Sequence, residues 1–403
     1  MLTESTKSLL KKLKPVTFEQ LGKYRFMLFG SGGFAKRIYK EYKKCIVGLI
    51  EYENALLNAK PSHFESIWFL PEQASGTVLL GTGNGTFQFN QLCALSEQAA
   101  DRIDEILVVD PYLSLRGFQF SSLDKNILLF EHADGVVRHG KHLSKLKKYF
   151  SRRGFNTLSI CPLMLLYYRD FLKCENLLIF NGQRKLYDIV FDSFPNKKLT
   201  YIEYGFFPQS EYYYFDKKGV NHRCSLMNDS LDWIDKHHLL ELEKIKSFFL
   251  KDFKSVALDY ILVPLQVPDD ANILNCSRFT NGMQEFIDYI DSEYSARERV
   301  VFKPHPKDPY QHQYDYRGRE VSELPFLTLL KHAKSVHGIT SSTLYEAALA
   351  GVDVISEGTS VLNQHIDQKD KLLAAMVERQ IHVENSDPRY WLDKYSHIDL
   401  TIC

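Results

Sequence analysis

The loop that follows the apolar run 299–303 carries side chains suited to binding a phosphate group. Its sequence is Lys303-Pro304-His305-Pro306, and an imidazole at the end of a buried strand can donate a hydrogen bond to a phosphate oxygen. The two prolines restrict the backbone and position the ring at little entropic cost. Ligands of parallel α/β sheets bind at this end of the strands. Lys303, His305 and Pro306 are therefore candidate phosphate-binding residues, and a purely structural loop is the alternative interpretation.

A second candidate anion site follows the run 335–339. Ser341, Ser342 and Thr343 stand between this run and a helical stretch that contains Glu346. Free backbone N–H groups at the start of a helix, with hydroxyl donors beside them, bind anions, and Glu346 one turn later could reach a ribose. Simple capping of the helix by Ser341 or Ser342 accounts for the pattern equally well. Two such loops on one sheet edge indicate a nucleotide phosphate more strongly than either loop does alone.

Carboxylates end two other predicted strands and could supply acid–base or nucleophilic chemistry. The segment 266–270 (QVPDD) follows the run 259–265 and ends in Asp269 and Asp270. Paired aspartates there fit a metal site, a nucleophile or a plain turn, and their spacing does not choose among the three. Glu203 ends a further apolar run and stands two residues before a glycine. It is a candidate general base, with turn formation as the default interpretation.

The stretch Gly30–Ala35 (GSGGFA) follows the apolar run 25–29 and fits the pattern G-x-G-x-x-A, and Glu51 lies further along the chain. In a Rossmann unit such glycines admit a pyrophosphate, and an acid about 20 positions on binds the ribose. The same tight turn also occurs in α/β domains that bind no NAD, and no recognisable acid–base pair for redox chemistry follows it. We expect this loop to be structural or to serve the acceptor, and not to be a redox site.

These candidate sites lie at the ends of alternating strands and helices, which predict an α/β protein with mostly parallel sheets. The length of 403 residues exceeds that of one ordinary core. We predict three units: an N-terminal Rossmann-like unit over 1–125, a second Rossmann-like unit over 126–254 that ends in a charged helical connector, and a third over 255–403. The predicted strands are 25–29, 45–50, 66–70, 78–80, 106–109, 126–130, 156–160, 177–180, 199–203, 259–265, 299–303, 335–339 and 352–356. Helices are predicted over 229–254, 281–293, 325–333 and 342–350.

The composition argues against several classes of protein. Lysine plus arginine equals aspartate plus glutamate at 50 each, so no overall field attracts nucleic acid. Seven scattered cysteines without a CxxC pair fit free thiols in a reducing compartment. No run reaches the roughly 18 apolar residues of a membrane span, and the N-terminus lacks the apolar stretch of a signal peptide. We expect a cytoplasmic protein whose basic run 141–153 is either a solvated helix face or a peripheral contact with an anionic membrane.

Taken in order, these segments resemble the capsule-polysaccharide-synthesis family of retaining β-Kdo glycosyltransferases. The resemblance is carried by YILVPLQVPDD at 260–270, RVVFKPHPKDP at 299–309, and AKSVHGITSSTLYEAALAGVDVI at 333–355. The family has a Gln-x-x-x-Asp segment, an HP motif and a Ser/Thr-rich loop before a helix. The segment 177–206 is also similar, but Tyr204 replaces the second acidic residue of the family there, so only Glu203 keeps an acid–base role. The resemblance covers roughly 126–358.

The resemblance implies a GT-B-like fold of two facing Rossmann-type units, with 126–254 on the acceptor side, 255–403 binding the CMP-sugar, and the N-terminal unit as an addition. It implies a retaining transfer of Kdo from CMP-β-Kdo to a glycan or glycolipid in capsule or O-antigen/lipopolysaccharide synthesis. The register that begins at Gln266 makes Asp270 the nucleophile, with Asp269 left to cap the turn. The remaining implied roles fall into two groups. Glu203 and His305 act in catalysis, and the donor is bound by Gln266, Lys303, His305, Pro306, Ser341, Ser342, Thr343 and Glu346.

Three alternatives remain open. Bacterial sialyltransferases have similar motifs and would use CMP-sialic acid with inversion, the glycine-rich loop could belong to an NAD-dependent enzyme, and the protein could bind nucleotide sugars without catalysis. The transferase scheme requires no metal and no cofactor besides the donor, and His132, His139 and His142 are expected at the surface. The expected partners are the CMP-sugar donor, a glycan or lipid-linked glycan acceptor and other glycosyltransferase modules, but no nucleic acid.

Overall fold

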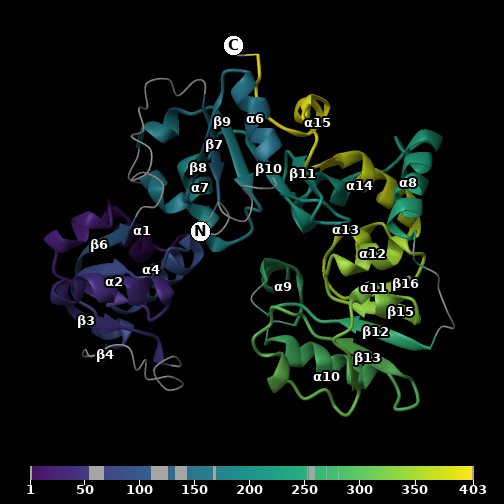
Figure 1. Cartoon of the computed structure of the whole chain (residues 1–403), viewed down its shortest axis with the longest axis horizontal. Coiled ribbons are helices and arrows are strands. Elements are labelled where there is room, and N and C mark those ends of the chain that lie inside the picture. The colour runs from purple at the N-terminus through teal and green to yellow at the C-terminus, as the bar shows by residue number, and fades with distance from the viewer. Residues whose placement is uncertain are drawn as a thin grey trace. The chain divides into compact units, whose positions relative to one another are not determined.

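A computed structural model of the chain describes residues 2–53, 68–109, 126–131, 143–166, 169–251, 253, 259–268, 270–279 and 281–401. His132, His139, His142 and Asp269 lie outside the described residues, as do the first two residues of the basic run 141–153. The chain forms two compact units (Figure 1). Unit 1 comprises Met1–Leu199 with His397–Cys403, and unit 2 comprises Thr200–Ser396.

Unit 1 contains an N-terminal sheet of six strands in the order β1-β6-β5-β2-β3-β4. All of its described strand pairs are parallel. Apolar residues of α2, among them Ala35 and Ile38, pack on Phe26 and Leu28 of the central strand β2. The strands are β1 (Leu13–Val16), β2 (Phe26–Phe29), β3 (Ile46–Ile50), β4 (Trp68–Phe69), β5 (Gly76–Leu80) and β6 (Ile103–Val109), and the helices are α1 (Glu4–Lys11), α2 (Gly33–Tyr42) and α4 (Gly85–Gln98).

The rest of unit 1 is a second parallel group of strands, in which β7 lies between β8 and β9. Its strands are β7 (Asn126–Phe130), β8 (Asn156–Ile160) and β9 (Asn176–Phe180), and its helices are α6 (Ser144–Arg152) and α7 (Asp188–Ser193). All three strands agree with the sequence prediction. Helix α6 contains most of the basic run, and its Leu146 and Phe150 are buried while Arg152 is exposed.

Unit 2 is built around a C-terminal sheet of five parallel strands in the order β14-β13-β12-β15-β16. The strands are β12 (Tyr260–Pro264), β13 (Val300–Lys303), β14 (Glu320–Val321), β15 (Ala333–Gly338) and β16 (Asp353–Ser356). The helices of unit 2 are α8 (Lys236–Phe249), α9 (Ala271–Cys276), α10 (Met283–Glu293), α11 (Phe326–Leu330), α12 (Thr343–Leu349), α13 (Val361–Gln364), α14 (Lys369–Arg379) and α15 (Arg389–Tyr395). The predicted α/β class with parallel sheets is confirmed.

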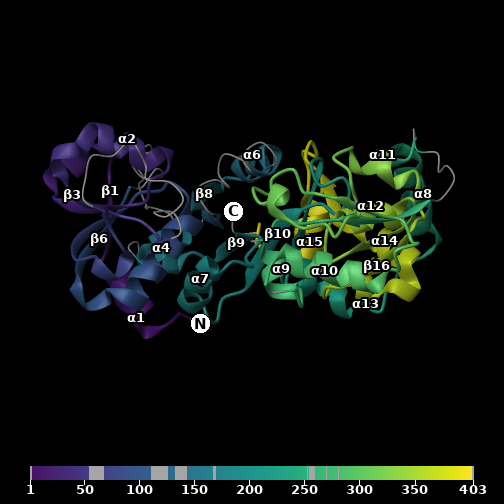
Figure 2. The same ribbon diagram turned by 90° about the horizontal axis from the view of Figure 1, so that it is seen from below.

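Both faces of the C-terminal sheet are covered by helices, as expected for buried parallel strands. Side chains alternate across a strand, so Ile261 and Val263 of β12 pack on α10. Leu262, between them, packs with α12 and α14 on the opposite face. Helix α10 accordingly lies on one side of β12 and β13 in Figure 1, and Figure 2 shows the same elements from below. The strand ends are therefore held by two separate apolar clusters.

One part of unit 2 departs from the predicted parallel arrangement. Strand β10 (Leu199–Tyr204), which carries Glu203, forms an antiparallel pair with β11 (Tyr212–Asp216), and β11 pairs antiparallel with β17 (Gln380–His382). The two strands of this hairpin approach each other closely at Gly205. A larger residue would not fit there, because a Cβ would lie 2.3 Å from Cβ of Tyr212. Only β10 was expected from the sequence. Glu203 therefore lies near the end of β10, in the strand that forms a hairpin with β11.

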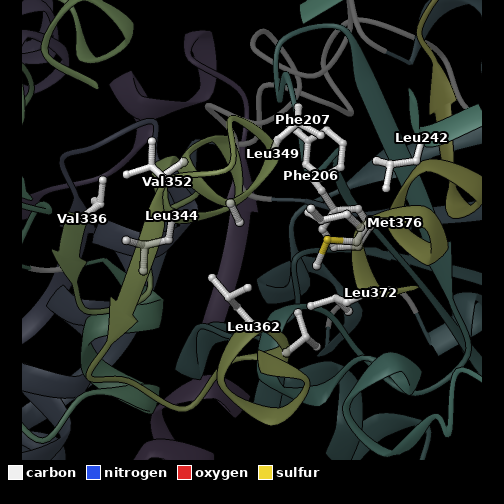
Figure 3. Close-up of a cluster of buried hydrophobic side chains, with 14 of the residues drawn as sticks. Phe206, Phe207, Leu242, Val336, Leu344, Leu349, Val352, Leu362, Leu372 and Met376 are labelled. Atoms are coloured by element: carbon white, nitrogen blue, oxygen red, sulfur yellow. The ribbon is translucent and has the colours of Figure 1, made fainter. Parts of the chain in front are cut away.

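A single apolar cluster joins the hairpin to the C-terminal sheet and its helices within unit 2 (Figure 3). The Phe206 ring stacks on Tyr214 of β11 at 4.5 Å between centroids and meets Tyr345 of α12 edge-on at 6.2 Å. Buried Gln380 accepts hydrogen bonds from the backbone N–H groups of Phe206 and Phe207, at 3.2 and 3.4 Å, and donates one to the Phe207 carbonyl at 3.0 Å. The position of Glu203 is thereby tied to the rest of unit 2.

Candidate active site

Three neighbouring strands of the C-terminal sheet bring most of the predicted site residues to one edge. Strand β12 lies between β13 and β15 and is parallel to both. Gln266 follows β12, His305 follows β13 and Thr340 follows β15. Carboxyl ends of adjacent parallel strands form the ligand-binding edge of an α/β sheet. The two loops singled out from the sequence are therefore neighbours on either side of the segment that contains Asp270.

Gln266 fixes the loop that follows β15. The side chain is 6% exposed, and its Oε1 accepts a hydrogen bond from the Thr340 backbone N–H at 2.9 Å. Its Nε2 donates a longer bond to Oγ1 of Thr340 at 3.4 Å. Gln266 thus acts as a clamp between two strand ends, which is a positioning role for the loop 340–343.

Loss of this clamp should loosen the loop. Gln266→Ala is expected to lower the free energy of unfolding of unit 2 by about 1–3 kcal/mol, because the Thr340 N–H loses its partner in a partly buried position. Gln266→Glu is the matched control, since its carboxylate can still accept from the same N–H. Urea unfolding followed by fluorescence measures both variants. Equal stability of the alanine variant and the unsubstituted protein would contradict the clamp.

In the hydroxyl-rich loop before α12, some hydroxyl groups make local hydrogen bonds and one makes no capping bond. Oγ of Ser341 accepts from the Thr343 backbone N–H at 3.3 Å and from Oγ1 of Thr343 at 2.8 Å. Ser342 occupies the N-cap position, and its side chain makes no capping hydrogen bond. Ser341 therefore takes the capping role that the sequence left open, and the Ser342 hydroxyl remains available to a ligand.

Glu346, in the first turn of α12, is a partly buried carboxylate. Burial raises its pKa to about 7, because a charged carboxylate loses hydration there. Such a group is partly protonated near neutral pH, so it can donate as well as accept a hydrogen bond. That capacity suits contact with a hydroxyl group, as the sequence analysis expected for a ribose.

His305 is held in a defined orientation at the end of β13. Its Nδ1 accepts a hydrogen bond from the Lys307 backbone N–H at 3.2 Å, which leaves the proton of the neutral ring on Nε2. Burial, with the charge of Lys307, lowers the pKa of His305 below its ordinary value, so the ring is neutral at pH 7. The site thus offers an Nε2–H donor without requiring a protonated imidazole.

The backbone of the His305 loop is anchored by Asp308, which is 2% exposed. The Asp308 backbone N–H donates to the His305 carbonyl at 2.9 Å, and the carboxylate accepts from Tyr310 N–H at 2.9 Å and from the Tyr314 hydroxyl at 2.7 Å. Pro306 is exposed. Nζ of Lys303 makes only long contacts, at 3.4 and 3.5 Å, with backbone carbonyls. The lysine is therefore weakly held and close to the loop.

Asp270 is the N-cap residue of α9, with Oδ1 accepting from the Asn272 backbone N–H at 2.8 Å. Asp269, which the sequence analysis expected to cap the turn, lies outside the described residues, so that expectation stays a prediction. Asp and Asn are favoured at N-caps because the side-chain oxygen satisfies a free N–H of the first turn. The negative charge of Asp270 also acts to raise the pKa of His305, against the larger effect of burial. Within the described part of the chain, Oδ2 of Asp270 makes no hydrogen bond.

Glu203 connects to the same region through its hairpin. It is 8% exposed, and its Oε1 accepts from the Tyr204 backbone N–H at 2.9 Å. Its register partner is Tyr214. The Tyr214 hydroxyl accepts from the Asn221 N–H at 3.3 Å, and the Asn221 side-chain amide donates to Oδ1 of Asn272 at 2.9 Å. This polar chain, which we call the hairpin–α9 link, connects the neighbourhood of Glu203 to the helix capped by Asp270.

Sequence reasoning missed the residues beside α9. Nδ1 of His222 lies 2.8 Å from Sγ of Cys276, and Nε of exposed Arg223 lies 3.2 Å from Nε2 of the same imidazole. Burial raises the pKa of Cys276 to about 11 and lowers that of His222, so both groups are neutral at pH 7. Arg223 therefore adds a positive charge beside α9 that the sequence analysis did not expect. No motif marks these residues, because a separate segment brings them to α9.

A second missed cluster holds the turn after β16. His337, 1% exposed, lies 2.8 Å from the Tyr294 hydroxyl through Nδ1 and 2.9 Å from Oε1 of Glu357 through Nε2. Oε2 of Glu357 pairs with Arg278 at 2.7 Å. Both imidazole nitrogens of His337 and both carboxylate oxygens of Glu357 have partners, so we assign the cluster a structural role.

Neither a metal cluster nor a membrane span is found in the part of the chain that the structure describes. No group of three or more His, Cys, Asp or Glu side chains there is arranged to hold a metal ion. Of the helices in the described ranges, none is sufficiently long and apolar to cross a bilayer.

Comparison with known proteins gives a family match to part of the chain. Residues 235–365 match the model of a family described as capsule polysaccharide biosynthesis protein. Protein FixF of Sinorhizobium fredii is 27% identical over 205 residues, which cover 46% of this chain and 49% of FixF. The match thus spans about half the length of that relative.

Two solved structures from Thermosulfurimonas dismutans are also similar. KpsC, beta Kdo 2,7 transferase, superposes with a TM-score of 0.48 and 16% identity, covering 64% of this chain and 96% of that chain. KpsC, beta Kdo 2,4 transferase, gives a TM-score of 0.46 and 13% identity, covering 62% and 90%. Gln266, Asp270, His305 and the loop 340–343 all fall inside the segment that the family model matches. The predicted resemblance to capsule polysaccharide biosynthesis proteins is therefore confirmed over residues 235–365.

Proposed function

We propose that the chain is a glycosyltransferase that moves Kdo from CMP-β-Kdo to a glycan or lipid-linked glycan of a bacterial surface polysaccharide. The observation that carries the proposal is the meeting of Gln266, Asp270, His305 and the loop 340–343 at one sheet edge. All of them lie in the segment that matches the capsule polysaccharide family. The reaction would take place in the cytoplasm, with peripheral access to a membrane-linked acceptor and with other transferase modules as partners.

In this proposal the phosphate of CMP lies between the His305 loop and the loop 340–343. The Nε2–H of His305 and the hydroxyl of Ser342 would donate to its oxygens, and Lys303 would supply a mobile positive charge. Donors placed where charge develops on the leaving group lower the barrier to its departure. Glu346 would contact the ribose. No metal or other cofactor enters this scheme.

The transfer would proceed as two displacements. The Asp270 carboxylate attacks the anomeric carbon, the bond to the CMP oxygen breaks, and a glycosyl ester forms. The acceptor hydroxyl then attacks the same carbon from the opposite side while Glu203 removes its proton and Asp270 leaves. Two inversions give net retention. Because the donor carries its own carboxylate, the approach of Asp270 meets like-charge repulsion, and Lys303 and Arg223 are the cations that would offset it.

CMP affinity tests the donor site directly. His305→Ala is expected to weaken CMP binding by about 1.5–3 kcal/mol, the usual contribution of a hydrogen bond to a charged group. Isothermal titration calorimetry measures the change. His312→Ala, an exposed histidine further along the same segment, is the matched control and should bind CMP normally. Unchanged affinity in the His305 variant would reject this assignment of the phosphate site.

A further inference from the structure

The glycine-rich loop of unit 1 opens into a cavity that the proposed transfer reaction does not use. The cavity has a volume of about 450 Å³, within the range of small-molecule sites. Its walls come from the segments that follow β2, β3 and β5 and from helix α4. The lining residues are Gly30, Ser31, Gly32, Gly33, Phe34, Glu51, Tyr52, Gly81, Thr82, Phe87, Asn90 and Gln91.

The cavity lies where the order of strands in the N-terminal sheet reverses. Strand β2 has β3 on one side and β5 on the other, so the connections that leave β2 and β5 diverge. Such a switch point is where ligands bind in open α/β sheets. Gly30 has φ +110°, and a Cβ on Gly81 would lie 2.5 Å from the Phe29 carbonyl oxygen. Glycines at these two positions keep the floor of the cavity clear of side chains.

The phosphate side of the cavity is the start of α2, a helix of 10 residues. Its N-cap is Gly32, which has no side chain to satisfy the N–H groups of the first turn, and the first turn carries no acidic residue. Free N–H groups at a helix start bind anions. Gly32 and Gly33 line the cavity, and a Cβ on either residue would meet nothing within 4 Å.

Two buried polar side chains provide an independent observation. Glu51, at the end of β3, is 6% exposed and lines the cavity. One of its oxygens accepts from the Tyr52 backbone N–H at 3.0 Å, and no described cation pairs with it. Gln91 is also 6% exposed, and its Nε2 donates to the Phe29 carbonyl at 2.9 Å. Its Oε1 is buried and has no hydrogen-bond partner among the described residues. Unsatisfied buried acceptors of this kind are rare in native proteins.

We propose that this cavity binds a nucleoside diphosphate, with the diphosphate at the N–H groups of Gly32 and Gly33 and the ribose hydroxyls at Glu51. A lone phosphate would account for the start of α2 but not for Glu51, because a carboxylate repels anions. A carboxylate instead accepts hydrogen bonds from hydroxyl groups. A ligand that carries both a diphosphate and a free diol satisfies both ends. The diphosphate belongs to a free nucleotide, a nucleotide sugar or one half of a dinucleotide. The site is separate from the proposed CMP site and does not depend on it.

Substitution of Gly32 separates ligand binding from folding. Gly32→Asp places a carboxylate where the diphosphate lies, and it supplies a favourable N-cap to α2. In the whole 403-residue chain we expect affinity for ADP and UDP to fall by about tenfold or more, while the melting temperature without ligand stays equal or rises. Gly32→Ser keeps a cap without the charge and should bind more tightly than the aspartate variant. Gly22→Ala, which meets only Tyr42 at 3.7 Å, is the control.

Glu51→Ala tests the ribose end. Calorimetry with ADP and 2′-deoxy-ADP should show that the unsubstituted protein prefers ADP and that the variant has lost this preference. Titrations with NAD and UDP identify the source of the diphosphate: tighter binding of NAD than of ADP indicates a dinucleotide, and comparable binding of ADP and UDP indicates a nucleotide or nucleotide sugar. Failure of all four ligands to bind, or binding that Gly32→Asp leaves unchanged, would overturn the proposal.

Discussion

Asp270→Asn is expected to lower sugar transfer by about 10⁴-fold or more, the scale on which loss of a covalent nucleophile acts, and to leave CMP affinity nearly unchanged. An amide cannot form the glycosyl ester, but its oxygen can still accept from the Asn272 N–H that Asp270 now caps at 2.8 Å. Asn and Asp are equally good N-cap residues. The substitution therefore removes nucleophilicity while α9 keeps its cap.

The direct measurement is the intact mass of the protein after incubation with CMP-Kdo without an acceptor. The unsubstituted protein should gain the mass of one Kdo residue on Asp270, and Asp270→Asn should gain none. Asp367→Asn, which changes an exposed aspartate of the same unit, controls for altered charge. Asp269→Asn should cost far less activity, since the Gln-x-x-x-Asp register beginning at Gln266 ends on Asp270.

A product with inverted anomeric configuration would contradict the double displacement. It would favour a single attack by a base-activated acceptor, as in a sialyltransferase-like reaction with a CMP-linked ulosonic acid. Full activity of Asp270→Asn would likewise remove the nucleophile role. Neither result would change the expectation for His305, because both reactions require the CMP phosphate to be held as it leaves.

Glu203→Gln should lower turnover by about 10²–10⁴-fold, the range of general-base catalysis, with CMP binding largely retained. Glutamine has the same shape and keeps an oxygen for the Tyr204 N–H, which donates to Oε1 at 2.9 Å. The hairpin should therefore fold normally while the proton acceptor is lost. Steady-state kinetics with CMP-Kdo and a saturating acceptor give turnover, and calorimetry gives CMP affinity.

Glu211→Gln is the matched control for Glu203, since it changes an exposed glutamate of the same hairpin. Its turnover should be close to that of the unsubstituted protein. Near-normal turnover in Glu203→Gln would assign proton removal to water or to a group on the acceptor. A loss of CMP affinity that matches the loss of turnover would instead mean that Glu203 supports the donor site through the hairpin–α9 link.

The strands that form the ligand-binding edge could be predicted because their signals are local. Apolar runs gave β12 and β13, the mixed segment 335–339 gave β15, and the expected helix 281–293 corresponds to α10 at Met283–Glu293. Strands β11 and β17 were not found. Strand β11 (YYYFD) is a short aromatic run that the sequence analysis did not assign, and β17 has only three residues, which pair with β11. Tertiary pairing of this kind leaves no period in the sequence.

In the candidate site, too, the local signals could be found in the sequence and the contacts between distant segments could not. Residue types and their spacing in the sequence indicated Gln266, His305 and the loop 340–343 separately. The parallel strands before them bring all three to one edge of the C-terminal sheet. The contacts that fix them were hidden, since the bond from Gln266 to Thr340 spans 74 positions. The choice of Asp270 as the cap of α9 depends on backbone geometry that two adjacent aspartates do not reveal. His222 and Arg223 could be placed only once the hairpin–α9 link was known.

The bonds from Gln380 to Phe206 and Phe207 have a consequence for synthesis of the protein. Because these partners are 173 and 174 positions apart, most of unit 2 must leave the ribosome before the strand that carries Glu203 acquires its final neighbours. Chains emerge from the N-terminus at about 5–20 residues per second, so the hairpin waits for roughly ten seconds or more. During that interval Phe206 has its stacking partner Tyr214, but it lacks Tyr345, and the N–H groups of Phe206 and Phe207 lack Gln380. Attachment of chaperones to nascent chains should therefore be strongest after the hairpin emerges and should fall once β17 follows.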